Sequence, residues 1–130
     1  MSQENVETVR RIYERVSASM EWPAELFDAD FESDMHEVWG VGALRFDATL
    51  EALREYFGTF EGFHVEMEEL IHADGEHVVN TIRDGGRIRG SDDEVWNHYF
   101  HVWTFGDGKI VRLSVHTERK RALEAAGLSE

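Results

Sequence analysis

The sequence contains no cysteine and a single proline, and basic residues are scarce. Its 130 residues include 13 Lys and Arg against 27 Asp and Glu, which gives a formal net charge of −14. Without cysteine, the chain has no disulfide framework, no thiolate metal site and no cysteine nucleophile. The acidic excess lies in residues 1–80, where 19 acidic side chains accompany 5 basic ones. An acidic surface repels nucleic-acid backbones and anionic membranes, so we expect neither as a partner.

Long apolar runs are also missing. No run approaches the ~18 residues of a membrane span, and the first residues, MSQENVETVRR, lack the apolar centre of a secretory signal. We therefore expect a cytoplasmic protein. The chain is nevertheless 42% hydrophobic, with 4 Trp and 8 Phe, and its length suits one domain over residues 1–130.

Helix signals occupy the first half of the chain and its end. Residues 4–19 carry apolar side chains at spacings of three and four, which predicts an amphipathic helix. Its stripe consists of Val6, Val9, Tyr13, Val16 and Met20. Residues 48–60 predict a second helix, with Asp47 as its N-cap. Shorter helices are expected at 23–28, after the only proline, and at 118–126.

Strand signals dominate the second half. Alternating or β-rich segments at 63–73, 77–83, 94–105 and 109–117 are separated by glycine-containing turns, and a shorter strand is expected at 31–36. Gly85 and Gly86 predict a bend or bulge. Helices followed by a meander of antiparallel strands indicate an α+β fold.

The segment 94–105, EVWNHYFHVWTF, is apolar on both faces. Trp96, Phe100 and Val102 share one face by strand parity, and the other face begins with Asn97 and continues through Tyr99, His101, Trp103 and Phe105. A sheet with one face in solvent would keep that face polar. We expect helices to cover one face and a second copy of the chain to cover the other, as a homodimer through the outer sheet face.

Several segments carry a family resemblance. VETVRRIYERV, AELFDADFESDMH, LEALREYFGTFEGF and HVWTFGDGKIVRL, followed by RALEAAGL, resemble in this order the SnoaL-like branch of the nuclear-transport-factor-2-like superfamily. The resemblance covers almost the whole chain. It implies a cone-shaped, curved antiparallel sheet wrapped around the N-terminal helix, with an apolar pocket at the open end. It also implies dimers through the outer sheet face.

The family includes polyketide cyclases, ketosteroid isomerases, limonene-epoxide hydrolases, dehydratases and members without catalysis. By resemblance, Tyr13 takes the place of the isomerase donor tyrosine, and His101 the place of its protonated aspartate. The isomerase base falls on Asp34 or Met35, depending on one gap. Tyr13, Asp34 and His101 are thus the candidate catalytic residues.

Two other chemistries fit the sequence less well. An epoxide hydrolase of the limonene type needs an Asp-Arg-Asp relay, but Arg83, Arg87 and Arg89 have no aspartate at the expected strand positions. Glu32, Asp34 and His36 share a strand face, but a zinc site would need further histidines to converge on them. We predict no metal and no cofactor.

The sequence favours a pocket for a neutral or weakly polar, largely apolar small molecule. We expect its walls to include five aromatic side chains, namely Trp39, Phe57, Phe60, Tyr99 and Trp103. Aromatic neighbours would lower the pKa of His101 and keep the imidazole neutral. The expected chemistry is proton transfer on an apolar carbonyl compound, in an isomerisation, an aldol-type cyclisation or a dehydration. The alternative is a non-catalytic ligand-binding or protein-interaction dimer.

Overall fold

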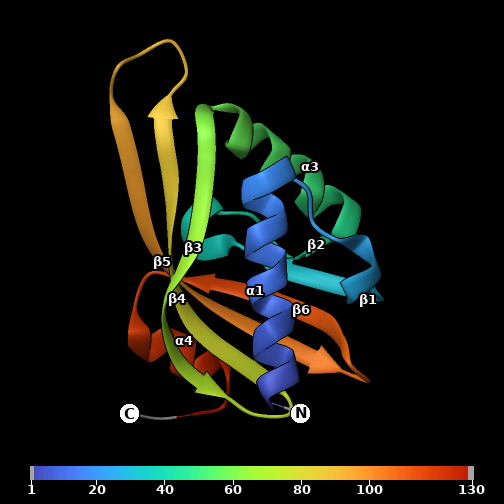
Figure 1. The fold of residues 1–130 in the computed structure, drawn as a ribbon. Coiled ribbons are helices and arrows are strands. Elements are labelled where there is room, and N and C mark those ends of the chain that lie inside the picture. The colour runs from blue at the N-terminus through green and yellow to red at the C-terminus, as the bar shows by residue number, and fades with distance from the viewer. Residues whose placement is uncertain (1, 129–130) are drawn as a thin grey trace.

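Helices come first in the chain and long strands follow, as Figure 1 shows for a computed structural model that describes residues 2–128. The elements are α1 (Ser2–Ser19), η1 (Ala24–Leu26), β1 (Phe27–Asp34), α2 (His36–Trp39), β2 (Leu44–Arg45), α3 (Phe46–Gly58), β3 (Phe60–Ala73), β4 (His77–Ile88), β5 (Glu94–Gly106), β6 (Lys109–His116) and α4 (Arg119–Ala125). The prediction of an α+β fold is confirmed. No helix within residues 2–128 is long and apolar enough to cross a membrane.

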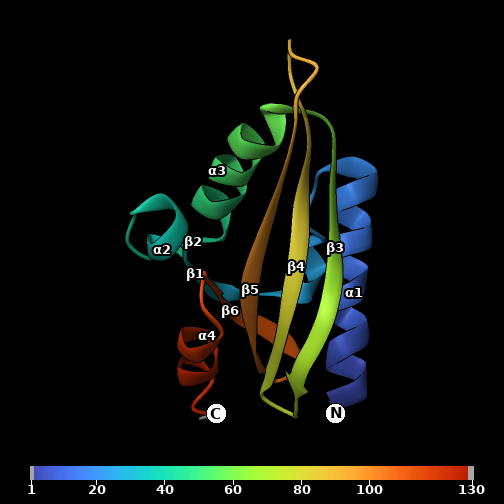
Figure 2. The same ribbon diagram turned by 90° about the vertical axis from the view of Figure 1, so that its left-hand side faces the viewer.

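One sheet organises the structure. Its six strands lie in the order β2-β1-β6-β5-β4-β3, and all neighbours are antiparallel except β1 and β6. The sheet is curved and unclosed. The helix α1 packs along β3 and β4, whereas α4 packs on β5 and β6 (Figure 2). Helices therefore contribute to both faces of the sheet.

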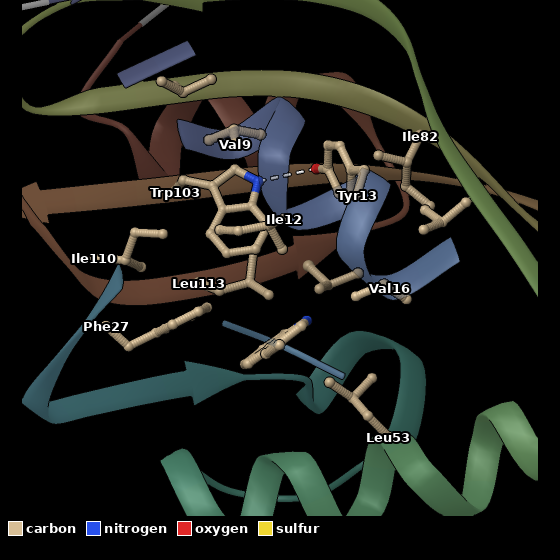
Figure 3. Packing of buried hydrophobic residues seen from close by; sticks show 14 of the residues in the cluster. Val9, Ile12, Tyr13, Val16, Phe27, Leu53, Ile82, Trp103, Ile110 and Leu113 are labelled. Atoms are coloured by element: carbon tan, nitrogen blue, oxygen red, sulfur yellow. Dashed lines mark hydrogen bonds between the residues drawn. The ribbon is translucent and has the colours of Figure 1, made fainter. Parts of the chain in front are cut away.

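The buried face of α1 anchors the core. Val6, Val9, Tyr13 and Val16 are buried as the spacing predicts, and Ile12 joins them with no exposed surface. Figure 3 shows side chains of this stripe directed toward Trp103 and Leu113, which come from the sheet. Sheet and helix thus share one apolar core.

Several predicted boundaries shift in the structure. The second helix begins at Phe46, so Asp47 lies in its first turn and is not the N-cap; Phe60 already belongs to β3. The helix expected at 23–28 shrinks to the single turn of η1. Its end is replaced by β1 because Phe27 pairs with Ile110 of β6 and stacks on Trp22 at 4.8 Å. Long-range pairing overrides local helix preference here.

The strand β4 continues past the glycine pair to Ile88, where the sequence suggests a bend. The irregularity lies in the partner strand, because the register between β3 and β4 shifts between Glu61 and His64. Gly85 has φ +145°, and a Cβ atom there would lie 1.9 Å from the carbonyl oxygen of Val95. Only glycine lets the two strands approach this closely.

The outer face of β5 is partly covered by the chain itself. Ala122 and Ala126 at the C-terminal end pack against Val79 and Val102 in a small second cluster, and Phe100 borders it. The apolar outer face therefore does not by itself require a second subunit along its whole length. Trp96 and Phe100 remain half-buried.

Candidate functional site

A pocket lies between α1, α2, α3 and the inner face of the sheet. It is partly open to solvent, and its cavity volume is about 70 Å³. Four of the five predicted wall residues line it: Trp39, Phe57, Tyr99 and Trp103. The fifth, Phe60, is buried beside the pocket against Tyr56 and Phe63 and is not part of its lining.

One polar network centres on the hydroxyl of Tyr13. This oxygen lies 2.8 Å from Nδ1 of His101, 2.9 Å from Nδ2 of Asn80 and 2.9 Å from Nε1 of Trp103. Figure 3 shows the bond that Trp103 donates. Burial raises the pKa of Tyr13 well above its usual value, and the hydrogen bonds from Asn80 and Trp103 only partly offset it. The phenol is therefore neutral.

His101 belongs to this network and lines the pocket. Burial, with a smaller contribution from nearby His116, lowers its pKa from 6.5 to about 3. This direction is the one that its aromatic surroundings suggest. The imidazole is neutral near pH 7.

A second polar network surrounds Asp84 in β4. Tyr56 of α3 donates a hydrogen bond of 2.9 Å to Oδ1 of Asp84, and Asn97 of β5 donates to the Tyr56 hydroxyl at 2.9 Å. Asn97 also reaches Oδ1 at 3.4 Å. Burial raises the pKa of Asp84, although the bonds from Tyr56 and Asn97 act in the opposite direction. Among residues 2–128, no group bonds to Oδ2 of Asp84, and this atom is not sealed inside the protein.

Strand register sets the spacing of the two networks. Asn80 faces His101, Ile82 faces Tyr99, and Asp84 faces Asn97 across the β4–β5 ladder. Asp84 and Asn80 are four residues apart on one strand, which corresponds to about 13 Å along the backbone. The pocket thus has a carboxyl group toward one end and an imidazole toward the other, with Tyr99 and Ile82 between their strand positions.

Comparison with known proteins identifies the family. The sequence profile of the SnoaL-like domain matches residues 9–113, which is most of the chain. The chain belongs to the SnoaL-like family. No curated protein gives a significant match.

Solved structures agree with this SnoaL-like fold. A candidate SnoaL-like polyketide cyclase from Jannaschia sp. CCS1 superposes with a TM-score of 0.74 at 22% identity, covering 88% of this chain and 85% of that one. AclR, a candidate hydroxylase from Streptomyces galilaeus, gives 0.77 at 12% identity, with coverages of 100% and 85%. An epoxide hydrolase of the LEH-like type from M. tuberculosis gives 0.66 at 21% identity, with coverages of 88% and 82%. At these identities the likeness establishes the fold and leaves the activity open.

The SnoaL-like structure separates Asp34 from the other two candidate catalytic residues. Asp34 ends β1 on the outer side of the sheet, where it bonds to Nδ1 of His36 at 2.8 Å and to Arg112 at 3.2 Å. It does not line the pocket, whereas the next residue, Met35, does. Partial burial raises the pKa of Asp34, but the bonds from His36 outweigh it and leave the pKa below its usual value. Of the two positions that the resemblance left open, the structure brings Met35 to the pocket.

Asp84 is the pocket carboxylate that the sequence did not reveal. The Asp-Gly-Gly sequence predicts a bend or bulge, and a side chain at such an irregularity has no defined sheet face. Because β4 continues through the glycines, Asp84 shares a sheet face with Ile82 and Asn80. The sequence did contain one signal for this position, because residues 80, 82 and 84 alternate along a strand and would share a face if the strand continued.

A further cluster lies outside the pocket of this SnoaL-like chain. Nδ1 of His116 bonds to Glu37, and Nε2 lies 2.9 Å from Oγ of Ser114. Ser114 is 3% exposed and none of the three residues lines the pocket, so the cluster ties α2 to β6 and leaves the serine inaccessible to a substrate. Among residues 2–128, no group of three or more His, Asp or Glu side chains is arranged to hold a metal ion.

Proposed function

We propose that the protein binds a neutral, mainly apolar small molecule in this pocket and moves a proton on it, with Asp84 as the base. The observation that carries this proposal is the position of Asp84. It is the one carboxylate among the lining residues, and its Oδ2 has no partner in the part of the chain described. A free carboxylate oxygen beside an apolar ligand is suited to removing a proton from carbon.

The surroundings of Asp84 support this role. A general base works best when its pKa lies near the operating pH, and burial moves the pKa of Asp84 upward in that direction. Tyr56 and Asn97 engage Oδ1, which leaves Oδ2 as the proton acceptor. Asp84 replaces Asp34 in the proposed mechanism, because Asp34 is committed to His36 and Arg112 on the other side of the sheet.

His101 supplies the polar contact at the other end of the pocket, with Tyr13 behind it. A carbonyl compound placed between the two groups would present an acidic C–H to Asp84 and direct a polar group toward His101. Loss of the proton gives an enolate, which can be reprotonated elsewhere, attack a second carbonyl or expel a leaving group. These outcomes correspond to isomerisation, aldol-type cyclisation and dehydration.

Hydrogen–deuterium exchange tests the proposal without knowledge of the natural substrate. A panel of cyclic enolisable ketones is incubated with the protein in D₂O, and loss of the signal of the hydrogen next to the carbonyl is followed by NMR. We expect exchange with at least one ketone, and a decrease of roughly 100-fold or more in the Asp84→Asn variant. Asp92→Asn, which changes an exposed aspartate in the β4–β5 turn, is the matched control and should exchange at the wild-type rate.

The same spectra separate catalysis from simple binding. Ketones that perturb the resonances of pocket residues without any exchange would contradict the proton-transfer role and assign the pocket to ligand binding alone. Exchange that survives in Asp84→Asn would remove Asp84 from the mechanism.

We also propose that a second copy of the chain packs on the outer sheet face. Trp96 and Phe100 are half-buried there in the single chain, and α4 covers the end of the face near Val79 and Val102. The Arg83 guanidinium lies 3.7 Å from the ring centroid of Trp96 and shields part of the indole. The remaining apolar surface is the proposed contact between copies.

A further inference from the structure

The Tyr13 hydroxyl has one proton to donate and two lone pairs with which to accept. The indole Nε1 of Trp103 can only donate, and Nδ2 of Asn80 is also a donor. These two bonds use both lone pairs of the Tyr13 oxygen. Its single proton is then directed to the third neighbour, Nδ1 of His101 at 2.8 Å. Nδ1 must therefore accept, and the proton of the neutral imidazole is on Nε2.

The orientation of the Asn80 amide decides this assignment. Nδ2 of Asn80 lies 2.9 Å from the Tyr13 hydroxyl and 3.4 Å from the carbonyl oxygen of Thr81, so both of its hydrogens are directed at acceptors. Oδ1 of Asn80 is buried without a partner among the described residues. Rotating the amide by 180° would place Oδ1 against the Thr81 carbonyl oxygen, a contact between two acceptors, and would remove both hydrogen bonds that Nδ2 donates. The observed orientation keeps these two bonds and leaves one acceptor unpaired.

A charged His101 does not fit the same network. Protonation of Nδ1 would give the Tyr13 oxygen a third donor for two lone pairs, and the phenol proton would lose its acceptor. This conflict acts in the same direction as burial, which lowers the pKa of His101 to about 3. The network therefore selects one charge state and one tautomer.

The other imidazole nitrogen is available to a ligand. Within residues 2–128, Nε2 of His101 has no hydrogen-bond partner, and it is not an atom sealed inside the protein. His101 lines the pocket and its Nδ1 is engaged by Tyr13, which leaves Nε2 as the ring nitrogen that can contact a ligand there.

We propose that Tyr13 is a positioning residue which, held by Asn80 and Trp103, fixes His101 as the Nε2–H tautomer and makes it a hydrogen-bond donor to the pocket ligand. Tyr13 itself has no proton left for a ligand, which differs from the donor role that the family resemblance implies. The ligand must then present an acceptor to His101, such as a ketone oxygen that becomes an enolate oxygen. This statement about the ligand rests on the proposed function, whereas the tautomer does not.

Nitrogen-15 NMR of the full chain reads the tautomer directly, because protonated and unprotonated ring nitrogens have separate chemical shifts. At pH 7, His101 is expected to show a protonated Nε2 and an unprotonated Nδ1. Tyr13→Phe removes the proton donor to Nδ1 and should give a mixture of tautomers. Ser17→Ala is the matched control, since Ser17 lies one turn further along α1 and bonds only to the backbone of Val65. It should leave the His101 shifts unchanged.

A wild-type spectrum with the proton on Nδ1 would overturn the assignment, and so would a Tyr13→Phe variant with an unaltered tautomer. If Tyr13→Phe does not fold, Trp103→Phe provides the same test. It frees one lone pair of the Tyr13 oxygen, allows Nδ1–H to donate, and should also produce mixed tautomers.

Ligand binding tests the donor role. A cyclic ketone should shift the Nε2 resonance of His101, whereas the hydrocarbon of the same shape should not. The preference for the ketone over the hydrocarbon, measured as a ratio of Kd values, should fall at least fivefold in Tyr13→Phe. A ketone that binds without moving Nε2 would overturn the donor role even if Asp84-dependent exchange occurs. Absence of exchange with the tautomer intact would instead contradict the proposed proton transfer alone.

Discussion

The phenol of Tyr56 donates a hydrogen bond of 2.9 Å to Asp84, and the same phenol accepts one of 2.9 Å from Asn97. Three elements, α3, β4 and β5, meet at this point. Burial raises the pKa of Asp84, whereas the bonds from Tyr56 and Asn97 stabilise the carboxylate and lower it. The pKa of Asp84 is therefore set by its hydrogen-bond partners as well as by its burial.

Replacing Tyr56 with Phe should raise the pKa of Asp84 further, because the carboxylate loses its strongest donor. A hydrogen bond to a charged group contributes on the order of 1.5–3 kcal/mol, so the acidic limb of the exchange rate against pH should move upward by roughly 1–2 pH units. Tyr99→Phe is the control, since Tyr99 lines the pocket without a hydrogen bond to Asp84 among the described residues. An acidic limb that does not move in Tyr56→Phe would contradict this coupling.

His101 should make the fold less stable as the pH falls below about 6.5. In the unfolded chain the imidazole takes up a proton near pH 6.5, whereas in the folded protein its pKa is about 3. The unfolded state then binds the proton first, and stability decreases with a slope of up to about 1.4 kcal/mol per pH unit. Asp34 and Glu37, whose pKa values are lowered, lose their contributions only at more acidic pH. Asp84, whose pKa is raised, contributes equally to the wild type and to a variant at position 101, so the difference between the two isolates the histidine.

Urea unfolding of the wild type and of His101→Gln, measured at several pH values in this window, checks the slope. With falling pH, the change in the free energy of unfolding should be more destabilising in the wild type than in His101→Gln, and the difference between the two slopes is the contribution of His101. Equal slopes in the two proteins would show that His101 titrates in the folded state as it does in the unfolded chain.

Gly85→Ala should destabilise the fold by roughly 3 kcal/mol or more, because strain at positive φ adds to a displacement of β5. The added Cβ would lie 1.9 Å from the backbone oxygen of Val95, which cannot move away as a side chain can. Gly90→Ala is the matched control, with φ +81° and open space around the added carbon. It should cost roughly 1 kcal/mol. Urea titrations followed by tryptophan fluorescence compare the two, and similar midpoints would contradict the close-approach argument.

Light scattering tests the dimer. We expect a particle of about twice the 15.0 kDa chain mass at micromolar concentration, and a larger dimer fraction at higher salt, because salt screens the net charge of −14 on each copy. Trp96→Ala should weaken the association, whereas Glu51→Ala on the exposed side of α3 should not. A monomer at all concentrations tested would contradict the proposed dimer through the outer sheet face.

The sequence by itself determined the fold class and the apolar stripe of α1, and its segments carried the resemblance to the family. The fold class and the stripe depend on periodicity and turn residues, which are local properties. It also indicated that Tyr99, His101 and Trp103 share a face, since strand parity follows from the alternation of side chains.

The tertiary structure decided which polar groups meet in the pocket. Asp84 enters it because β4 continues through Gly85 and Gly86, which depends on the close approach of Val95 in β5. Asp34 is excluded because β1 pairs with β6 in a register that turns its side chain toward Arg112. The tautomer of His101 depends on Tyr13, which is 88 positions away in the chain, and on the amide of Asn80. Such contacts join residues from separate helices and strands, so no local pattern in the sequence specifies them.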